Sequence, residues 1–406
     1  MSEPIISPTL QSNIFLENMK GQGKKVYNFG LGENPIMQPY YYSKKMIQHV
    51  NRKGYTSCQG VPELNSALKS LYNSPENKIK YEILTGNGLK ELLFVVQCTF
   101  KGKIIHITPS WVSYKEHIDV LDKHDDLVEI PTKIEDEFRV DLGLLEEKLI
   151  ELGDVPKLLL FNNPHNPTGI CYYNHELEKL SDLLRKYNVV VFSDEIYLNL
   201  TYRNGQKSIA NYLPELTIRG SSVSKDLACG GYRLGWCAFP DTLQDLFIKC
   251  CQCASRVYSC TAAPIQYATA EMINNKDVYQ GYVKKQIELF VFIKTMLINT
   301  ISETKLKYAN IDAAWYIFLD FENYKSSLKK ININNSIDLG QYLMNHYQII
   351  TVAAEHFSDD SLALRFSMVD FEFDLEDKST AIEDVDISNM IEGFEQLKQF
   401  LDDICE

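Results

Sequence analysis

Short apolar runs alternate with amphipathic stretches between residues 100 and 240, and this alternation constrains the fold more than any other feature of the sequence. The runs have the length of buried strands, and the stretches between them carry apolar residues at helical spacing. One stretch places Leu177, Leu180 and Leu184 on a single face, and Asn174 stands where it can cap that helix. This pattern predicts an α/β fold with a mostly parallel sheet covered by helices. The predicted strands are 103–108, 127–130, 157–161, 189–193 and 236–240, and the predicted helices are 112–124, 141–152 and 174–187.

A smaller α+β domain is predicted in the last quarter of the chain. A long helical region from about 261 to 300 leads to it, and the acidic residues from 370 to 386 are predicted to form a solvated loop. The elements expected in this domain are a strand at 313–321, a helix at 336–347, a strand at 362–369 and a closing helix at 389–401. We therefore divide the chain into an N-terminal arm that packs with the small domain (1–33), a large domain (34–270), and an interdomain helix with the small domain (271–406).

The charge balance disfavours two classes of partner. The 406 residues carry a net charge of −13, whereas a surface that binds nucleic acid or an anionic membrane needs clustered lysine and arginine. The longest apolar stretch, 288–298, is too short to span a membrane and contains Lys294. Because the N-terminus has no signal-like core, we expect a cytoplasmic protein with neither nucleic acid nor membrane as a partner.

Four of the ten cysteines lie close together in the sequence, at Cys250, Cys251, Cys253 and Cys260. A metal site is one interpretation, but the segment reads as a helix, and neither a histidine nor a second CxxC pair accompanies it. Buried free thiols are the simpler interpretation, because cysteine packs readily as a small apolar group. We therefore expect no metal.

Polar residues follow three of the predicted strands. Ligands of open α/β sheets bind beyond the carboxyl ends of the strands, so these residues are candidates for a site. An acid at such a position is costly to bury and needs a cationic partner. The candidates are Trp111 and Tyr114 after the first strand, Asn163, His165 and Asn166 after the third, and Asp194, Glu195 and Tyr197 after the fourth.

Two further stretches suit the binding of an anion. The turn at Gly88 runs into an apolar helix, whose first backbone N–H groups, those of Leu89 and Lys90, are free to bind a phosphate. The stretch 221–235 places Lys225 between Ser222 and Arg233, so that an amine can reach a carbonyl carbon while a hydroxyl and a guanidinium hold a phosphate. Each stretch alone is equally compatible with an ordinary turn or loop.

Eight motifs in order resemble the class I/II aminotransferases, which are pyridoxal-phosphate (PLP) enzymes similar to aspartate aminotransferase. The resemblance extends from Gly32 to Arg365 and implies PLP fold type I, with a seven-stranded sheet in the large domain. The sequence departs from the family pattern at Asn34 and Ile36, and at Cys229. The motifs are GLGENP, YTSCQGVPEL, TGNGLKELL, PSWVSY, NPHNPTG, SDEIY, SVSKDLACGGYRLG and LALRF.

The resemblance implies a role for each residue that would face the cofactor ring. Lys225 would carry PLP as a Schiff base and would later move the substrate proton. Asp194 would keep the pyridine nitrogen protonated, so that the ring accepts electrons. Asn166 and Tyr197 would hydrogen-bond the phenolic oxygen, and Trp111 would stack on the ring.

The resemblance also implies phosphate, substrate and subunit contacts. Arg365 would grip the substrate α-carboxylate as a bidentate pair, together with Asn166 and the turn at Gly32. Tyr55 would reach the phosphate of the neighbouring subunit, which implies a homodimer with shared active sites. The phosphate would be held by Gly88, Leu89, Lys90, Ser222 and Arg233.

The implied reaction moves an amino group from an L-amino acid to a 2-oxo acid. A PLP-dependent lyase, decarboxylase or oxidase would use the same scaffold, and a non-catalytic PLP-binding protein is a third interpretation. Arg256 stands near a position where dicarboxylate-specific members carry an arginine, and Trp315 is a candidate for narrowing the pocket. The sequence does not identify the amino acid.

Overall fold

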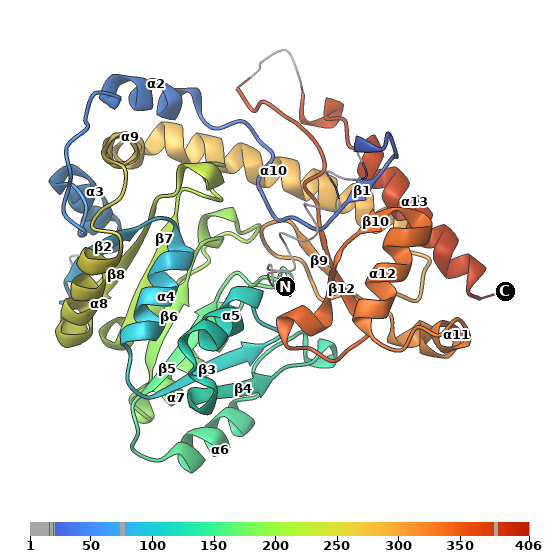
Figure 1. The fold of residues 1–406 in the computed structure, drawn as a ribbon, viewed down its shortest axis with the longest axis horizontal. Helices are drawn as coiled ribbons and strands as arrows, with labels where there is room; N and C mark the ends of the chain where they lie inside the picture. Colours follow the sequence, from blue (N-terminus) through green and yellow to red (C-terminus); the bar gives the residue numbers. More distant parts are fainter. Residues whose placement is uncertain (1–15, 17–18, 20, 74–77, 377–380, 406) are drawn as a thin grey trace, which may run out of the picture.

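The computed structural model describes residues 16, 19, 21–73, 78–376 and 381–405. Figure 1 shows a large part built around a central sheet and a smaller part that contains β9, β12 and α11 to α13. Helix α10 (Lys276–Ile301) runs along one side of the molecule from the large part to the small part. Of the first 20 residues of the predicted N-terminal arm, the structure describes 16 and 19.

The large part contains a seven-stranded sheet with the strand order β2-β8-β7-β6-β5-β3-β4. Strand β8 is antiparallel to both of its neighbours, and the other neighbouring pairs are parallel. The prediction of a mostly parallel seven-stranded sheet is therefore confirmed. The strands are β2 (Tyr81–Gly86), β3 (Lys103–Thr108), β4 (Leu127–Pro131), β5 (Lys157–Asn162), β6 (Val190–Asp194), β7 (Thr217–Ser222) and β8 (Gly235–Pro240).

Two of these strands do not follow from the hydrophobic pattern of the sequence. Strand β2 runs directly into the glycine turn that precedes α4, so its apolar residues merge with those of the helix. Strand β7 has the sequence TIRGSS, in which Ile218 is the only large apolar residue. Its charged residue, Arg219, is accommodated in the sheet because it pairs with Glu195.

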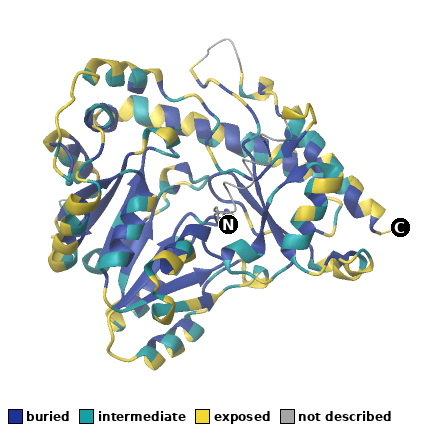
Figure 2. Ribbon diagram, viewed as in Figure 1, coloured by how far each residue is buried: buried dark blue, intermediate teal, exposed yellow. Residues whose placement is uncertain are grey.

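Helices cover both faces of the sheet because successive strand residues point in opposite directions. On β5, Leu159 packs with residues of α6 and α7, whereas Leu158 and Leu160 pack on the other face with residues of α4, α5 and α8. Figure 2 shows buried strands between helices whose outer faces are exposed. These helices are α4 (Leu89–Thr99), α5 (Val112–Leu121), α6 (Leu142–Leu152), α7 (Asn174–Lys186) and α8 (Gln244–Val257), and α2 (Tyr40–His49), α3 (Pro62–Tyr72) and α9 (Ala263–Asn274) pack near β2 and β8.

The small part contains a three-stranded antiparallel sheet in the order β11-β12-β9. The chain near its N-terminus joins this part, because β1 (Tyr27–Asn28) pairs in parallel with β10 (Ile349–Ile350) and Phe29 packs against Phe366 and Phe394. The remaining elements are β9 (Tyr316–Asp320), β11 (Val352–Ala353), β12 (Ala363–Ser367), α11 (Lys325–Lys330), α12 (Ser336–Tyr347) and α13 (Ser388–Asp403).

Two local predictions are wrong. Helix α7 is capped at Tyr173, whose backbone N–H donates 2.7 Å to the carboxylate of Glu176, and Asn174 is already its first helical residue. The acidic stretch from 370 to 386 is not simply a solvated loop, because Phe371, Phe373 and Leu375 alternate with its charged residues and are buried. This alternation allows one side of the segment to pack against the core.

Within the described ranges, no helix is long and apolar enough to cross a membrane. The ten cysteines are free thiols, and in the clustered segment Cys250 is fully buried on α8. No group of three or more histidine, cysteine, aspartate or glutamate side chains that could hold a metal occurs in the described part of the chain.

Candidate active site

A cavity of about 320 Å³ lies at the carboxyl ends of β5 and β6, between the large part and the small part. The strand ends and the loop after β7 supply most of its lining, as expected for an open α/β sheet. Ten of the predicted site residues line it, namely Gly32, Leu89, Lys90, Trp111, Asn166, Asp194, Tyr197, Lys225, Arg233 and Arg365.

Asp194 is the last residue of β6 and is almost completely buried. The Tyr114 hydroxyl donates a 2.9 Å hydrogen bond to its Oδ2, and the Ile196 N–H donates a 3.2 Å hydrogen bond to its Oδ1. Burial nevertheless dominates and raises the pKa of Asp194 to about 6. A cation brought to this carboxylate would reverse that shift, so the site is suited to a positively charged group.

Lys225 follows β7 in an irregular loop and reaches into the cavity. Its Nζ donates 2.6 Å to the carbonyl oxygen of Gly32. The ammonium also lies 5.9 Å from the ring centroid of Tyr197 and 5.6 Å from that of Trp315. One end of the side chain is thus directed at the turn where the resemblance places the substrate.

The predicted phosphate-binding residues form a close-packed corner around the start of α4. Gly88 has φ 86°, and a side chain there would come within 2.3 Å of the Arg233 guanidinium. A Cβ at Gly235 would lie 2.5 Å from the backbone nitrogen of Leu89. Arg233 donates 2.8 Å to the carbonyl of Asn87, so the guanidinium stands beside the free N–H groups of the helix start. Only glycine at positions 88 and 235 permits the guanidinium and the helix start to lie this close together. Because the corner combines a guanidinium with free N–H groups, it is suited to binding an anion.

Ser222 and Gly88 are not among the residues that line the cavity surface. Ser222 is fully buried, and its Oγ accepts a 3.1 Å hydrogen bond from the Ser224 N–H. Ser224 itself lines the cavity. The hydroxyl of Ser222 therefore braces the loop that leads to Lys225, one layer behind the surface.

Arg365 crosses from the small part into the cavity on strand β12. Its side chain is 2% exposed. The guanidinium donates a 3.1 Å hydrogen bond to the Asn166 Oδ1 and a 2.5 Å hydrogen bond to the Gly30 carbonyl, and it lies 4.8 Å from the centroid of the Tyr316 ring. It has no carboxylate partner among the described residues, and burial lowers its pKa. A buried guanidinium held only by neutral acceptors is suited to binding an anionic ligand.

Tyr316 is the principal site residue that the sequence did not indicate. Its hydroxyl lies 2.7 Å from that of Tyr197, and a Cβ on Gly32 would come within 2.2 Å of it. The motif AAWY drew attention to Trp315, which is fully buried beside Tyr316 and does not line the cavity. Tyr316 is the first residue of β9, whereas Trp315 lies in the turn that precedes the strand. The other residues of the lining are Leu31, Glu33, Asn162, Ile196, Ser224 and Gly230.

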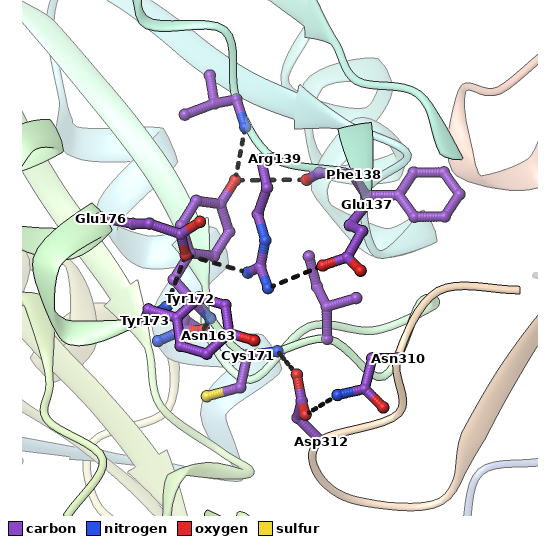
Figure 3. A network of polar contacts seen from close by, with 12 residues as sticks. Glu137, Phe138, Arg139, Asn163, Cys171, Tyr172, Tyr173, Glu176, Asn310 and Asp312 are labelled. Atoms are coloured by element: carbon purple, nitrogen blue, oxygen red, sulfur yellow. Dashed lines mark hydrogen bonds and ion pairs between the residues drawn. The ribbon is translucent and has the colours of Figure 1, made fainter. Parts of the chain in front are cut away.

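The loop that carries Asn166 is held by the network in Figure 3. Asn163 accepts a 2.9 Å hydrogen bond from the Tyr172 N–H, and the Arg139 guanidinium lies between two glutamates and 5.0 Å from the Tyr172 ring. On the other side, the Cys171 N–H donates 3.4 Å to Asp312, which belongs to the segment entering the small part. These contacts fix the loop against both parts of the molecule.

Two of the residues singled out in the sequence lie away from the cavity. Tyr55 is 97% exposed, and Arg256 donates 3.1 Å to the Gln252 carbonyl on the surface of α8. His165 bonds the Thr168 hydroxyl at 2.7 Å, which agrees with a structural role within its loop.

Comparisons with known proteins agree with this geometry. The pattern of the family described as "Aminotransferase class I and II" matches residues 24–372. The chain is 25% identical to a probable aspartate/prephenate aminotransferase of Aquifex aeolicus (86% of this chain, 89% of that protein) and 25% identical to an aspartate aminotransferase of Sulfolobus acidocaldarius (87% of each).

A similar fold is found in the aspartate aminotransferase of Thermus thermophilus with maleate. The TM-score is 0.82 at 21% identity, and the match covers 97% of each chain. Because the family pattern extends over most of the sequence and contains the motifs that line the cavity, this chain belongs to the class I and II aminotransferases, which transfer amino groups.

Proposed function

We propose that this protein is a PLP-dependent aminotransferase that moves an amino group from an L-amino acid to a 2-oxo acid. The observation that carries the proposal is the convergence of Lys225, Asp194 and Arg365 on one cavity. The amine would meet the aldehyde of PLP, the buried acid would meet its ring nitrogen, and the buried guanidinium would meet the carboxylate of the amino acid.

The residues of the cavity fit PLP at each of its polar groups. The buried Asp194, which has no ion-pair partner in the described part of the chain, would hold a proton on the ring nitrogen. The corner formed by Leu89, Lys90 and Arg233 would hold the phosphate, and Trp111 would cover one ring face. When bound, PLP supplies an aldehyde for the amino group and a ring that accepts electrons from Cα.

The residues of the chain then bind the substrate and move its proton. Arg365 would hold the α-carboxylate, with Asn166 fixing the guanidinium from the opposite side. The Lys225 amine would take the proton from the substrate Cα and deliver it to the C4′ carbon of the cofactor. Tyr197, positioned by its hydrogen bond to Tyr316, would orient the ring oxygen.

We also propose a dicarboxylic amino acid as the donor. The curated relatives described above are named for aspartate and prephenate. The Lys90 ammonium lines the cavity over the Trp111 ring, at 5.1 Å, and has no ion-pair partner among the described residues. It is therefore available to bind a second carboxylate after Arg365 has bound the first.

We propose a homodimer in which Tyr55 completes the phosphate site of the neighbouring subunit. In a single chain the side chain of Tyr55 is almost fully exposed. The side chains of Tyr40, Ile47 and Val50 are largely exposed as well. Exposed apolar side chains of this size favour a protein interface. Tyr55→Phe should weaken PLP retention, and subunit exchange with an inactive Lys225→Ala chain should restore it in mixed dimers.

The reaction can be tested in its two halves. Adding L-aspartate to the PLP-loaded protein should abolish the visible absorption band with release of oxaloacetate, and adding 2-oxoglutarate should restore the band. L-Alanine serves as the control donor that lacks a second carboxylate. Release of ammonia or carbon dioxide in place of the 2-oxo acid would contradict amino-group transfer.

A further inference from the structure

Asn34 contacts the catalytic lysine through the backbone, from the turn that also accepts the lysine ammonium. Its side chain is buried, and its Nδ2 donates 2.7 Å to the carbonyl oxygen of Lys225. Two residues earlier, the Gly32 carbonyl accepts the 2.6 Å hydrogen bond from Lys225 Nζ. One short segment therefore holds both ends of the lysine.

The amide of Asn34 is bonded to a second buried amide on the interdomain helix. Its Nδ2 also donates 2.7 Å to the Oε1 of Gln286, a fully buried residue of α10. The Nε2 of Gln286 in turn donates 2.6 Å to the carbonyl oxygen of Asp226. The two amides thus bond to each other, and each donates to one of two consecutive peptide carbonyls.

Helix α10 holds the same loop at the side chain of Asp226. Tyr279, two turns before Gln286, donates its hydroxyl hydrogen bond to the Asp226 carboxylate. The Nδ2 of Asn199 donates 2.9 Å to the same oxygen, and Asn199 lies in the turn that follows Tyr197. The lysine loop is therefore joined both to α10 and to the segment that carries Tyr197.

We propose that Asn34 and Gln286 are positioning residues that aim Lys225, acting as a paired amide clamp on the backbone of residues 225 and 226. This inference rests on the proposed function and extends it to residues outside the cavity lining. Lys225 lies in a loop without regular backbone hydrogen bonding, and its side chain has four rotatable bonds. Fixing its backbone carbonyl is therefore a direct means of directing its amine.

The clamp does more than fill space in the core. An apolar side chain of similar volume would pack at either position, but it would remove a side-chain donor from the loop. Without Asn34 the Lys225 carbonyl would keep the 3.2 Å hydrogen bond from the Ala228 N–H and lose the shorter one, and without Gln286 the Asp226 carbonyl would lose its amide donor, so the loop would be freer to shift. A displacement of about 1 Å in a reacting group can lower a rate by about 10²-fold, even when the fold is intact.

The test uses Asn34→Ala and Gln286→Met, with Gln97→Met as the matched control. Gln97 is also a fully buried amide, on α4, and it bonds His117 at 2.9 Å. The readouts are the rate at which the visible band forms when PLP is added to cofactor-free protein, kcat, KM, and the melting temperature. Gln286→Glu is the second variant, because it keeps the side-chain volume and the acceptor for Asn34 and, in its ionised form at high pH, removes the donor to Asp226.

We expect both clamp variants to form the band about tenfold more slowly or worse and to lose kcat to a similar degree, with KM changed less than about threefold. The control should lower the melting temperature while both rates stay within about twofold. The double variant should be no slower than the slower single variant, since residues that act as a unit are not additive.

Clamp variants that lose stability like the control but keep the wild-type rates would overturn the inference. If Gln286→Met does not fold, an unchanged rate in Gln286→Glu at high pH would overturn it equally. Failure of the proposed function gives a different result, because wild-type protein would then form no lysine-dependent band at all.

Discussion

Two adjacent acids at the end of β6 have opposite surroundings. Glu195 faces away from the active-site cavity and receives three hydrogen bonds from Arg219, at 2.8, 3.0 and 3.1 Å. Asp194 faces the cavity, and from the described residues its carboxylate receives two hydrogen bonds, one from the Tyr114 hydroxyl and one from the Ile196 N–H. Both side chains are buried, but among the described residues Asp194 has no ion-pair partner, whereas Glu195 is paired with Arg219.

The same contrast holds for two arginines, the half-buried Arg219 and the buried Arg365. Arg219 is neutralised by Glu195, whereas the hydrogen bonds of Arg365 to described residues go to the neutral oxygens of Asn166 and Gly30. A buried charge without a counterion is costly for the folded protein. We infer that the far side of the strands is built for stability and that the cavity side keeps charges available for a ligand.

The largest expected effect is that of Lys225→Ala on the cavity side. Removing the amine removes both the covalent attachment and the proton carrier, so kcat should fall by about 10⁴-fold or more. Steady-state kinetics on the PLP-supplied variant measures this loss. Lys90→Ala is the control, since it removes a neighbouring amine and should affect the KM for a dicarboxylic donor much more than kcat.

Arg365→Leu should have the next largest effect. Loss of the guanidinium leaves the α-carboxylate without its buried partner, which lowers kcat/KM by about 10²- to 10³-fold, or about 3–4 kcal/mol. Arg365→Lys keeps the charge without the planar fork and should recover only part of the loss. Unchanged amino-acid affinity in the leucine variant would show that the carboxylate binds elsewhere.

On the far side, Arg219→Met should change stability and leave the chemistry intact. The substitution strands Glu195 as a buried unpaired carboxylate, so the free energy of unfolding should fall by about 3–5 kcal/mol. Denaturant titration measures the loss, and kcat per folded molecule should stay within about twofold. A large drop in kcat at normal stability would contradict the division between the two sides.

The smallest effect is a pH dependence that Asp194 imposes on the cofactor-free protein. Because its pKa rises from 3.8 to about 6 on folding, the folded state binds more protons than the unfolded state between about pH 4 and 6. Stability should therefore fall as the pH rises through that window, by about 3 kcal/mol in total. In Asp194→Asn this contribution should be absent, and comparing unfolding free energies at pH 4 and pH 7 checks it. An identical pH profile in the two proteins would refute the raised pKa.

The sequence was sufficient to predict the strands whose apolar residues are continuous. Strand β5 reads as KLLLF because both of its faces are buried, and the predicted helix at 336–347 coincides with α12. Strand β7 was not predicted, since the burial of its arginine depends on Glu195, a residue that approaches only in the folded sheet.

The site was predictable where a motif or strand end carries the chemistry, as at Asp194 and Lys225. Tyr316 and Gln286 were not, because each contacts a partner that is distant in the chain. Tyr316 lies 2.7 Å from Tyr197, 119 residues away, and Gln286 lies 2.6 Å from the Asp226 carbonyl, 60 residues away. Asn34 was noticed only as a departure from the family pattern. Its two hydrogen-bond partners are set by tertiary packing, which a single sequence does not specify.

The most direct test of this account is to locate the lysine that binds PLP. Wild-type protein should be loaded with PLP, reduced with borohydride, digested and analysed by mass spectrometry, with Lys90→Ala treated in parallel. We predict that the stable cofactor adduct lies on Lys225 in both proteins. An adduct on another lysine, or none at all, would contradict the assignment of Lys225 and of the cavity built around it.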